Sequence, residues 1–386
     1  MTLLEAATHA DPYLYYSGLR QNKDLYFDPA PGLWVACGAT AVAAILQHPD
    51  CRVRPVHEPV PTAIAQGSAG WVFSRLMRMN EGARHQCPRA VIEPALMDVP
   101  QEEVAALVGS LTGRAEHCAE SLNRLMFNLP VSVLATLMGF QVTQLQTVAG
   151  LTRDFVACLS PLSNASELRN ADIAATRLSH MLNVLLSDGQ QRSHFLSAIC
   201  RSFKASDWQD HDALIANLIG LLSQTCEACA GLIGNTLVAL QQQPGLLEEM
   251  TRTPVLVNKL VAEVARYDSP VQNTRRFVAR QCTIGDSVLH AGDTVLLLLA
   301  SANRDPAANP EPDSFLLTRG ERRSFSFSQA RHQCPGQQLA LMIVAETIST
   351  LLQQPAASLR RPLRWCYLPS LNGRIPHFRN HLEPEQ

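Results

Sequence analysis

Apolar residues recur at three- and four-residue spacing along most of the chain, which is the period of an amphipathic α-helix. The pattern is clearest in residues 133–138, 174–186, 212–243 and 338–354. Segment 212–243 is unusually long and few charged side chains interrupt it. We therefore predict a buried central helix there that crosses most of the molecule.

Strand-like patterns are few and short. Residues 32–36 precede a helical segment, and residues 276–299 carry β-branched residues broken by turn sequences, which predicts a small antiparallel sheet. Residues 365–378 predict a further hairpin. No low-complexity linker or solenoid repeat divides the sequence. We expect a mainly α protein, a single domain over residues 1–386 with small peripheral antiparallel β-sheets.

The composition indicates a folded protein without a nucleic-acid partner. Hydrophobic residues make up 46% of the 386 residues, charged residues 17%, and the net charge is −2. The 11 cysteines are odd in number and scattered, which favours a reducing cytosol. The N-terminal segment lacks the features of a signal peptide, and the longest aliphatic run, residues 295–300, is too short to span a bilayer. We expect a soluble cytoplasmic protein.

A cysteine stands directly before one of the predicted helices, in the segment Phe327-Ser-Gln-Ala-Arg-His-Gln-Cys-Pro-Gly336. A cysteine at a helix start lies near the positive end of the helix dipole, which favours the metal-binding thiolate. Pro335 and Gly336 fix a turn and allow close approach of the backbone to a planar ligand. A buried cysteine with an incidental histidine nearby would produce the same pattern.

The hexapeptide Ala-Arg-His-Gln-Cys-Pro occurs twice, at residues 83–88 and 330–335. Two His-x-Cys pairs could in principle form a zinc site with two cysteines and two histidines. Pairs in zinc sites are usually spaced to close a tight loop, whereas these lie far apart in the sequence. Only the second copy leads into Gly336 and a long apolar helix. We therefore predict Cys334, not Cys87, as the metal ligand.

The segment around Cys334 resembles the Cys loop of the cytochrome P450 family. The matching residues are Phe327, Ser328, His332, Cys334 and Gly336, whereas Ala330 stands where the family usually has glycine. The resemblance implies the triangular helical fold of a soluble, bacterial-type haem-thiolate monooxygenase, with haem b (iron protoporphyrin IX) bound through Cys334 and a propionate contacted by His332. A thiolate on haem iron donates electron density that promotes O–O cleavage. Because Ala330 is small, we expect the loop to survive with some strain.

Glu263 and Arg266 stand at i and i+3 in a segment with helical periodicity. An exposed pair of this kind would contribute little to stability. The pair resembles the Glu-x-x-Arg motif of the same family, which locks the core beneath the haem. The usual third partner is an arginine; Ser314 stands in its place, and Arg319 could substitute for it. The order of motifs from Glu263 to Cys334 matches the family.

Further basic residues match family positions that pair with the haem propionates. These residues are His85, Arg89 and Arg276. Pro88 is unfavourable inside a helix, so we expect that helix to start at Pro88 and His85 to lie in the preceding loop. A solvated surface charge is the alternative for any single arginine.

The central helix departs from the family where the resemblance implies an acid–alcohol pair for proton delivery. Glu227 aligns with the acid, but Ala228 stands in place of the threonine. Three explanations are open: the substrate supplies a hydroxyl or amine, Thr225 or a water held by Glu227 takes over, or the reaction is radical coupling or is driven by peroxide. We favour the first. A buried Glu227 would have a raised pKa, although it could also merely form hydrogen bonds inside a bent helix.

The resemblance implies that the protein oxidises a small or medium organic substrate and acts as a monomer without a membrane partner. It also implies that a ferredoxin or flavodoxin, with its reductase, supplies the electrons. We expect a role in secondary metabolism. A basic docking face, or a merely solvated cluster, could come from Arg319, Arg322, Arg323 and Arg331. The alternative function is a haem-bearing module that recruits a partner or a carrier-bound substrate without oxygenating it. Segments 50–80, 155–186, 271–273 and 370–372 match variable substrate regions by position, with Asn273 and Asn372 as possible orienting groups.

Overall fold

The computed structural model describes residues 1–3, 5–113, 118–187, 193–354 and 363–379. The helices are α1 (Tyr13–Asn22), α2 (Ala39–Gln47), α3 (Ser68–Arg75), α4 (Ala83–Met97), α5 (Gln101–Thr112), α6 (Ala119–Met138), α7 (Leu145–Val156), α8 (Ala165–Ser187), α9 (His194–Ala205), α10 (His211–Gln242), α11 (Leu246–Arg252), α12 (Val257–Tyr267), α13 (Leu299–Asn303) and α14 (Gln337–Gln353). The strands are β1 (Leu25–Asp28), β2 (Leu33–Ala36), β3 (Cys51–Arg52), β4 (Thr274–Val278), β5 (Cys282–Ile284), β6 (Ser287–Leu289), β7 (Thr294–Leu297), β8 (Arg364–Tyr367) and β9 (Pro376–Arg379).

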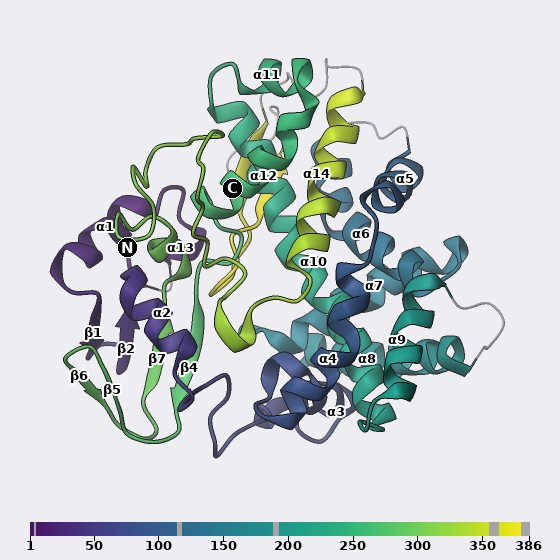
Figure 1. Cartoon of the computed structure of the whole chain (residues 1–386), viewed down its shortest axis with the longest axis horizontal. Coiled ribbons are helices and arrows are strands. Elements are labelled where there is room, and N and C mark those ends of the chain that lie inside the picture. Colours follow the sequence, from purple (N-terminus) through teal and green to yellow (C-terminus); the bar gives the residue numbers. More distant parts are fainter. Residues whose placement is uncertain (4, 114–117, 188–192, 355–362, 380–386) are drawn as a thin grey trace.

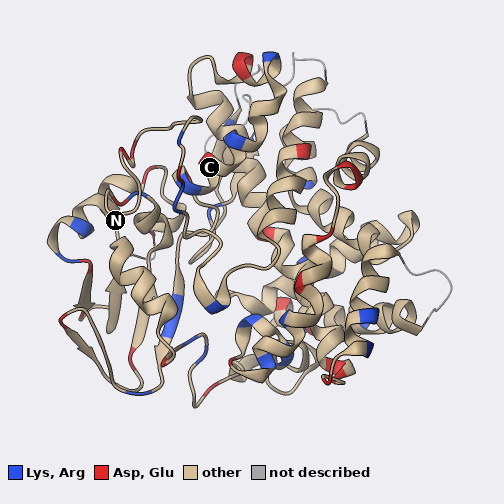
Figure 2. Cartoon of the chain, viewed as in Figure 1, with Lys and Arg blue, Asp and Glu red and all other residues tan. Residues whose placement is uncertain are grey.

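The strands and the helices are largely segregated. The main sheet lies on one side of the molecule with α1, α2 and α13, and α3 to α9 lie on the other, with α10 and α14 between them (Figure 1). Basic and acidic residues are interspersed over both sides (Figure 2). The predicted mainly α fold with small sheets is confirmed.

The main sheet has the strand order β1-β2-β7-β4-β3. β2 pairs with β7 in parallel, and the other neighbours are antiparallel. The prediction of one antiparallel sheet over residues 276–299 is therefore wrong in part, because β5 and β6 form a separate hairpin and β7 pairs with a strand from the N-terminal region. Local periodicity carries no information about such long-range pairing. The predicted C-terminal hairpin is confirmed as β8 and β9.

Helix α10 confirms the predicted central helix. The carboxylate of Asp210 caps its first turn by accepting a hydrogen bond from the backbone N–H of Ala213 at 2.9 Å. In the described part of the chain, α10 alone is long and apolar enough to cross a membrane, and 78% of its most apolar window is buried inside the protein. Its N-terminal half, as far as Cys226, packs into one apolar core, and its C-terminal half, from Cys229 onward, packs into a second.

Candidate functional site: a cavity beside Cys334

Residues 327–336, which we call the Cys loop, form a tight turn before α14. The backbone N–H of Cys334 donates to the carbonyl of Phe327 at 2.8 Å, and that of Gln333 donates to the carbonyl of Ala330 at 3.0 Å. Ser328 and Ala330 adopt φ values of +59° and +57°. A Cβ in this left-handed region costs about 1–2 kcal/mol. The structure therefore bears out the expected strain at Ala330, where the family usually has glycine.

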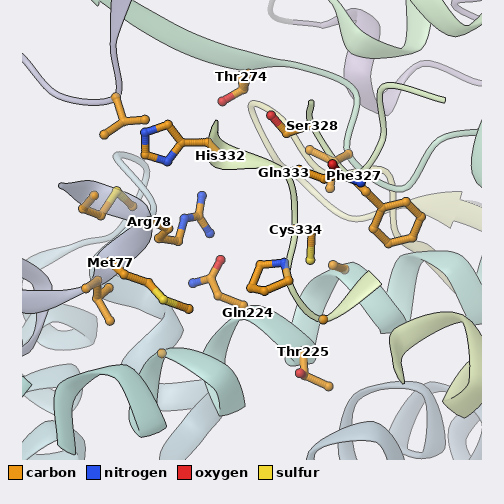
Figure 3. A pocket seen from close by; sticks show the side chains of 18 of the residues that line it. Met77, Arg78, Gln224, Thr225, Thr274, Phe327, Ser328, His332, Gln333 and Cys334 are labelled. Carbon is orange, nitrogen blue, oxygen red and sulfur yellow. The ribbon is translucent and has the colours of Figure 1, made fainter. Parts of the chain in front are cut away.

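Cys334 lines a cavity of about 440 Å³ that lies between the Cys loop and α10 (Figure 3). Burial raises the pKa of the Cys334 thiol; a hydrogen bond from the backbone N–H of Gly336 and the charges of Arg78 and Arg89 lower it only in part. In the metal-free protein desolvation therefore outweighs the predicted effect of the helix start, and the role of Cys334 as a metal ligand stays a prediction. A bound cation would favour the thiolate again.

The walls of the cavity are mostly apolar. They come from α10, the 3₁₀ turn Met77–Met79, β4 and the Cys loop. The arginines that line the cavity are Arg54, Arg78, Arg89, Arg275 and Arg276, and no Asp or Glu of the described chain lines it. Such a lining suits a ligand with an apolar body and acidic groups.

His85 lies in the first turn of α4. The prediction that this helix begins at Pro88 is wrong, because Pro88 falls in the second turn and removes only one backbone donor. Both ring nitrogens of His85 face carbonyl oxygens, that of Met77 at 2.9 Å and that of Arg331 at 2.8 Å. The ring also lies 4.2 Å from that of His332, centroid to centroid. His85 therefore joins α4 to the Cys loop.

Arg89 and His332 are also engaged with protein groups. Arg89 donates to the carbonyls of Arg331 and Gln333, and pairs with Glu93 at 2.6 Å. The Nε2 atom of His332 lies 3.1 Å from a carboxylate oxygen of Glu81. These contacts brace the Cys loop from α4 and from Glu81. The propionate contacts implied for His85, Arg89 and His332 stay predictions.

The carboxylate of Glu81 is held in its charged form. Burial would raise its pKa, but the hydrogen bond and charge of His332, the backbone N–H of Val53 and the charge of Arg331 outweigh burial and lower the pKa to about 2. Glu81 also pairs with Arg331 at 3.1 Å. It therefore ties the Cys loop to the segment after β3.

Arg276, on β4, provides a direct test of whether the residues fit a haem. Its side chain is buried, and its Nε has no hydrogen-bond partner among the residues that the structure describes. Burial lowers its pKa to about 10. A buried cation lacking an anion is unfavourable, and a carboxylate in the cavity would relieve this cost. The cavity therefore fits haem b. Cys334 suits the iron, the apolar walls suit the macrocycle, and Arg276 suits a propionate.

Helix α10 presents Gln224, Thr225 and Ala228 to the cavity. The hydroxyl of Thr225 donates to the carbonyl of Leu221 at 2.8 Å. It can therefore only accept a hydrogen bond from a ligand or water. Ala228 offers only a methyl group. Glu227 is not a lining residue, and its side chain is exposed; desolvation by neighbouring protein atoms still raises its pKa, and the charge of Arg78 partly offsets this.

Glu263 and Arg266 form a buried pair at 2.7 Å on α12. Arg319 lies 3.3 Å from the Glu263 carboxylate, as expected if it replaces the arginine whose position Ser314 occupies. Arg322 lies 2.8 Å from the same carboxylate. The basic docking face predicted with these residues is therefore not assembled, because the buried carboxylate turns Arg319 and Arg322 inward. Arg331 is committed as well, through its pair with Glu81.

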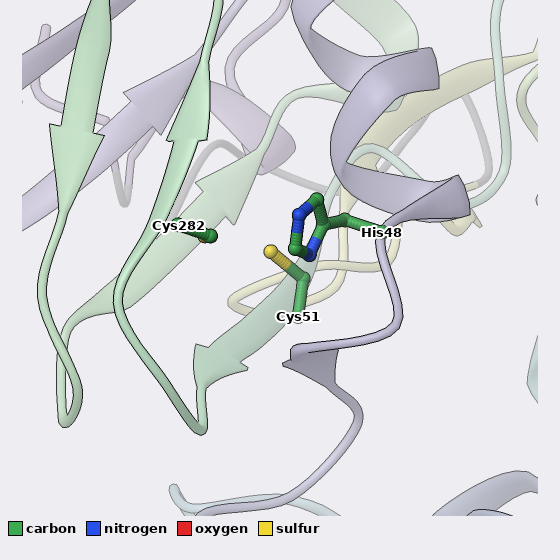
Figure 4. Close-up of side chains that lie close together, drawn as sticks. All are labelled: His48, Cys51 and Cys282. Atoms are coloured by element: carbon green, nitrogen blue, oxygen red, sulfur yellow. The ribbon is translucent and has the colours of Figure 1, made fainter.

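In the described ranges, one group of side chains has ligand atoms close enough to hold a metal ion: His48, Cys51 and Cys282 (Figure 4). None of the three lines the cavity. Burial raises the pKa of Cys51 to about 12, so without a metal it is a neutral thiol. The repeated hexapeptides do not form such a group, which leaves the zinc alternative without support.

Sequence reasoning missed Arg78 and Glu81. A lone arginine within the apolar run Leu76-Met-Arg-Met79 was a usable signal, since a charge between apolar residues is either exposed or paired with a ligand. Glu81 gave no comparable signal. Each of the four predicted substrate segments contributes to the lining of the cavity. Asn273 is less available than expected, because its amide donates to the carbonyl of Leu371 at 2.8 Å.

The profile of the family "Cytochrome P450" matches residues 238–356, which include α12, the Cys loop and α14. The biotin biosynthesis cytochrome P450 of Bacillus subtilis is 25% identical over 373 residues, which cover 93% of each chain. The cytochrome P450 monooxygenase PikC of Streptomyces venezuelae is 26% identical, over 89% of this chain and 84% of its own.

The fold is similar to that of solved structures. The crystal structure of P450BioI in complex with an acyl carrier protein ligated to hexadec-9Z-enoic acid superposes with a TM-score of 0.79 and 23% identity. The match covers 95% of this chain and 97% of that chain. At this identity the likeness shows the fold alone.

Proposed function

This chain belongs to the cytochrome P450 family, and from that premise we propose that it is a monooxygenase of a small or medium organic substrate in a biosynthetic pathway. Members of the family bind haem b through a cysteine thiolate. In the proposed reaction, dioxygen, two electrons and two protons insert one oxygen atom into the substrate and release the other as water. The observation that carries the proposal is Cys334, which lines a mostly apolar cavity where the described residues place no acidic side chain.

The residues of this chain have separable roles in the proposal. Cys334 would ligate the iron, and Arg276 would pair with a propionate. The haem would supply oxygen activation, which a thiolate ligand promotes. The apolar side chains of the cavity exclude water and orient the substrate by shape.

Proton delivery is where this chain departs from the pattern that the family resemblance implies. Ala228 cannot hold a water or pass on a proton, and the hydroxyl proton of Thr225 is committed to Leu221. We propose that a hydroxyl, amine or acid of the substrate orders the delivering water. Glu227, whose pKa is raised by desolvation, is the candidate donor behind it.

We infer that the electrons come from a separate ferredoxin or flavodoxin with its reductase, and that the protein acts as a cytoplasmic monomer. The relatives support a role in biosynthesis, since one is named for biotin biosynthesis. A relative has been solved with an acyl carrier protein, so a carrier-bound substrate is a specific alternative to a free one.

The decisive experiment is the absorption spectrum of the reduced, carbon monoxide-bound protein. We expect the long-wavelength Soret band of a thiolate ligand. Cys334→Ser should abolish it, whereas Cys87→Ser, in the other copy of the hexapeptide, should leave it unchanged. A non-thiolate Soret band in the unaltered protein would overturn the assignment.

Ala228 favours a second candidate function, a haem-bearing module that binds a substrate or carrier without oxygenating it, or that uses peroxide. Turnover with a surrogate redox pair, compared with turnover on peroxide, separates these functions. Substrate binding without product from either oxidant would favour the module.

A further inference from the structure

The 3₁₀ turn Met77–Met79 carries an arginine into the cavity. Arg78 is a lining residue of the cavity, and much of its side-chain surface is accessible. In Figure 3 its guanidinium points into the space between His332 of the Cys loop and Gln224 of α10. Desolvation by the neighbouring protein atoms lowers the pKa of Arg78, which reflects the cost of holding a charge there.

Arg78 has no hydrogen bond and no ion pair with any residue in the described parts of the chain. The carboxylate of Glu227 attracts it electrostatically, but neither Glu227 nor Cys334 hydrogen bonds to it. A guanidinium stays charged in proteins, and a partly desolvated one without a counterion gains from pairing with an anion. The side chain is therefore suited to an anion that enters the cavity.

The backbone that carries Arg78 is held firmly. The backbone N–H of Met77 donates to Oδ1 of Asn217 on α10 at 2.7 Å. The carbonyl of Met77 faces Nδ1 of His85, and the amide of Asn80 donates to the carbonyl of Leu76 at 2.8 Å. Such preorganisation is what a binding residue needs, because little entropy is then lost when the ligand binds.

The other arginines of the cavity are in different situations. Arg54 donates to backbone carbonyls and lies over the ring of Phe73, and Arg89 pairs with Glu93. Arg275 is half-buried and, like Arg78, has no ion pair among the described residues. Arg78 differs from Arg275 and Arg276 in its position, because its guanidinium points into the space between the Cys loop and α10 (Figure 3).

We propose that Arg78 is a carboxylate-binding residue of the cavity, which pairs with an acidic group of a bound molecule. The carboxylate has two possible sources, a haem propionate or an acidic substrate with an apolar body. The proposal deepens the proposed function and rests on it. In the second case the enzyme would prefer a free acid to the same acyl group in a neutral ester or thioester.

The test compares the unaltered full-length chain with Arg78→Gln, which keeps much of the side chain's length but removes its charge. Haem-free protein is titrated with haem b and with its dimethyl ester, and the affinity ratio reports a contact with the propionates. Haem-loaded protein is titrated with dodecanoic acid and with dodecan-1-ol, and the shift of the Soret band reports a contact with the substrate carboxylate.

Loss of about ten-fold or more of the preference for haem over its ester identifies the propionate as the partner. A similar loss of the preference for the acid over the alcohol, with haem binding unchanged, identifies the substrate. Arg78→Lys should restore part of either preference, because it keeps the charge. Unchanged preferences in both titrations of Arg78→Gln would overturn the proposal.

Arg75→Gln is the matched control. Arg75 lies three residues earlier, pairs loosely with Asp212 at 4.0 Å and does not line the cavity, so neither preference should change. If the unaltered chain fails to bind haem, the proposed function fails, but calorimetric titration of the haem-free chain with dodecanoic acid still tests Arg78. Equal heats for the unaltered and Arg78→Gln chains would then overturn the inference.

Discussion

At the scale of single residues, Ala330 shows how this chain tolerates a departure from the glycine that the family resemblance implies. Its φ of +57° lies in the left-handed region, where glycine avoids the clash of a Cβ with the backbone. The hydrogen bond from the Gln333 N–H to the Ala330 carbonyl and the contacts of the neighbouring Arg331 fix this conformation. The strain is therefore held in place by the rest of the Cys loop.

Ala330→Gly should raise the free energy of unfolding by about 1 kcal/mol. The relief of about 1–2 kcal/mol of left-handed strain is partly offset by the greater flexibility of glycine in the unfolded chain. Urea unfolding measures the change. The control is Ala106→Gly at an exposed position within α5, which should lose about 1 kcal/mol. A loss of stability in both variants would contradict the assignment of strain to residue 330.

The residues of the site were predictable where local sequence carries the signal. Cys334 could be identified because a loop, Gly336 and an apolar helix follow one another in the chain. Arg78 carried a local signal in its apolar run, but Glu81 was missed because its role depends on what lies opposite it in space. Glu81 acquires its function only from the backbone N–H of Val53 and from His332, which is 251 residues away.

At the scale of elements, helix α12 is the anchor for the irregular segment before the Cys loop. The carboxylate of Glu263 is fully buried and accepts hydrogen bonds from Arg266, Arg319 and Arg322 and from the backbone N–H of Leu316. The surrounding arginines lower the pKa of Glu263 despite its burial, which acts in the opposite direction. One carboxylate thus fixes a segment that has little regular structure of its own.

Glu263→Gln should reduce the free energy of unfolding by about 3–5 kcal/mol, because it leaves buried guanidinium groups without their shared counterion. Urea unfolding followed by circular dichroism measures the loss. Glu120→Gln is the control: Glu120 pairs with Arg124 at 3.3 Å, but both side chains are largely exposed, so the change should stay below about 1 kcal/mol. Equal effects of the two substitutions would show that Glu263 is not an anchor.

Helices were easier to predict than strands, for a physical reason. The 3.6-residue period of α10 and α14 is written locally in the sequence, whereas the pairing of β2 with β7 joins residues about 260 positions apart. Helix α6 extends well before the predicted segment 133–138, through Pro130. Helix α6 packs against α10, and this packing offsets the cost of a proline inside the helix. The local sequence does not encode that contact.

At the scale of the whole molecule, the cavity lies at the boundary between two apolar cores. Helix α10 belongs to one core as far as Cys226 and to the other from Cys229 onward, and Ala228, between them, lines the cavity. The protein interior is elsewhere close-packed. A ligand in the cavity would therefore supply contacts that the two cores cannot make with each other.

Haem loading should for this reason stabilise the molecule unevenly. Binding to the native state alone raises the free energy of unfolding, and hydrogen exchange measured by mass spectrometry locates the effect. We expect slower exchange in the middle of α10, in the turn Met77–Met79 and in the Cys loop, and little change in β1 and β2, which lie away from the cavity. Cys334→Ala is the control, because losing the ligand to the iron should weaken the protection in all three segments. Uniform protection, or protection confined to the main sheet, would place the haem elsewhere than at the boundary of the two cores.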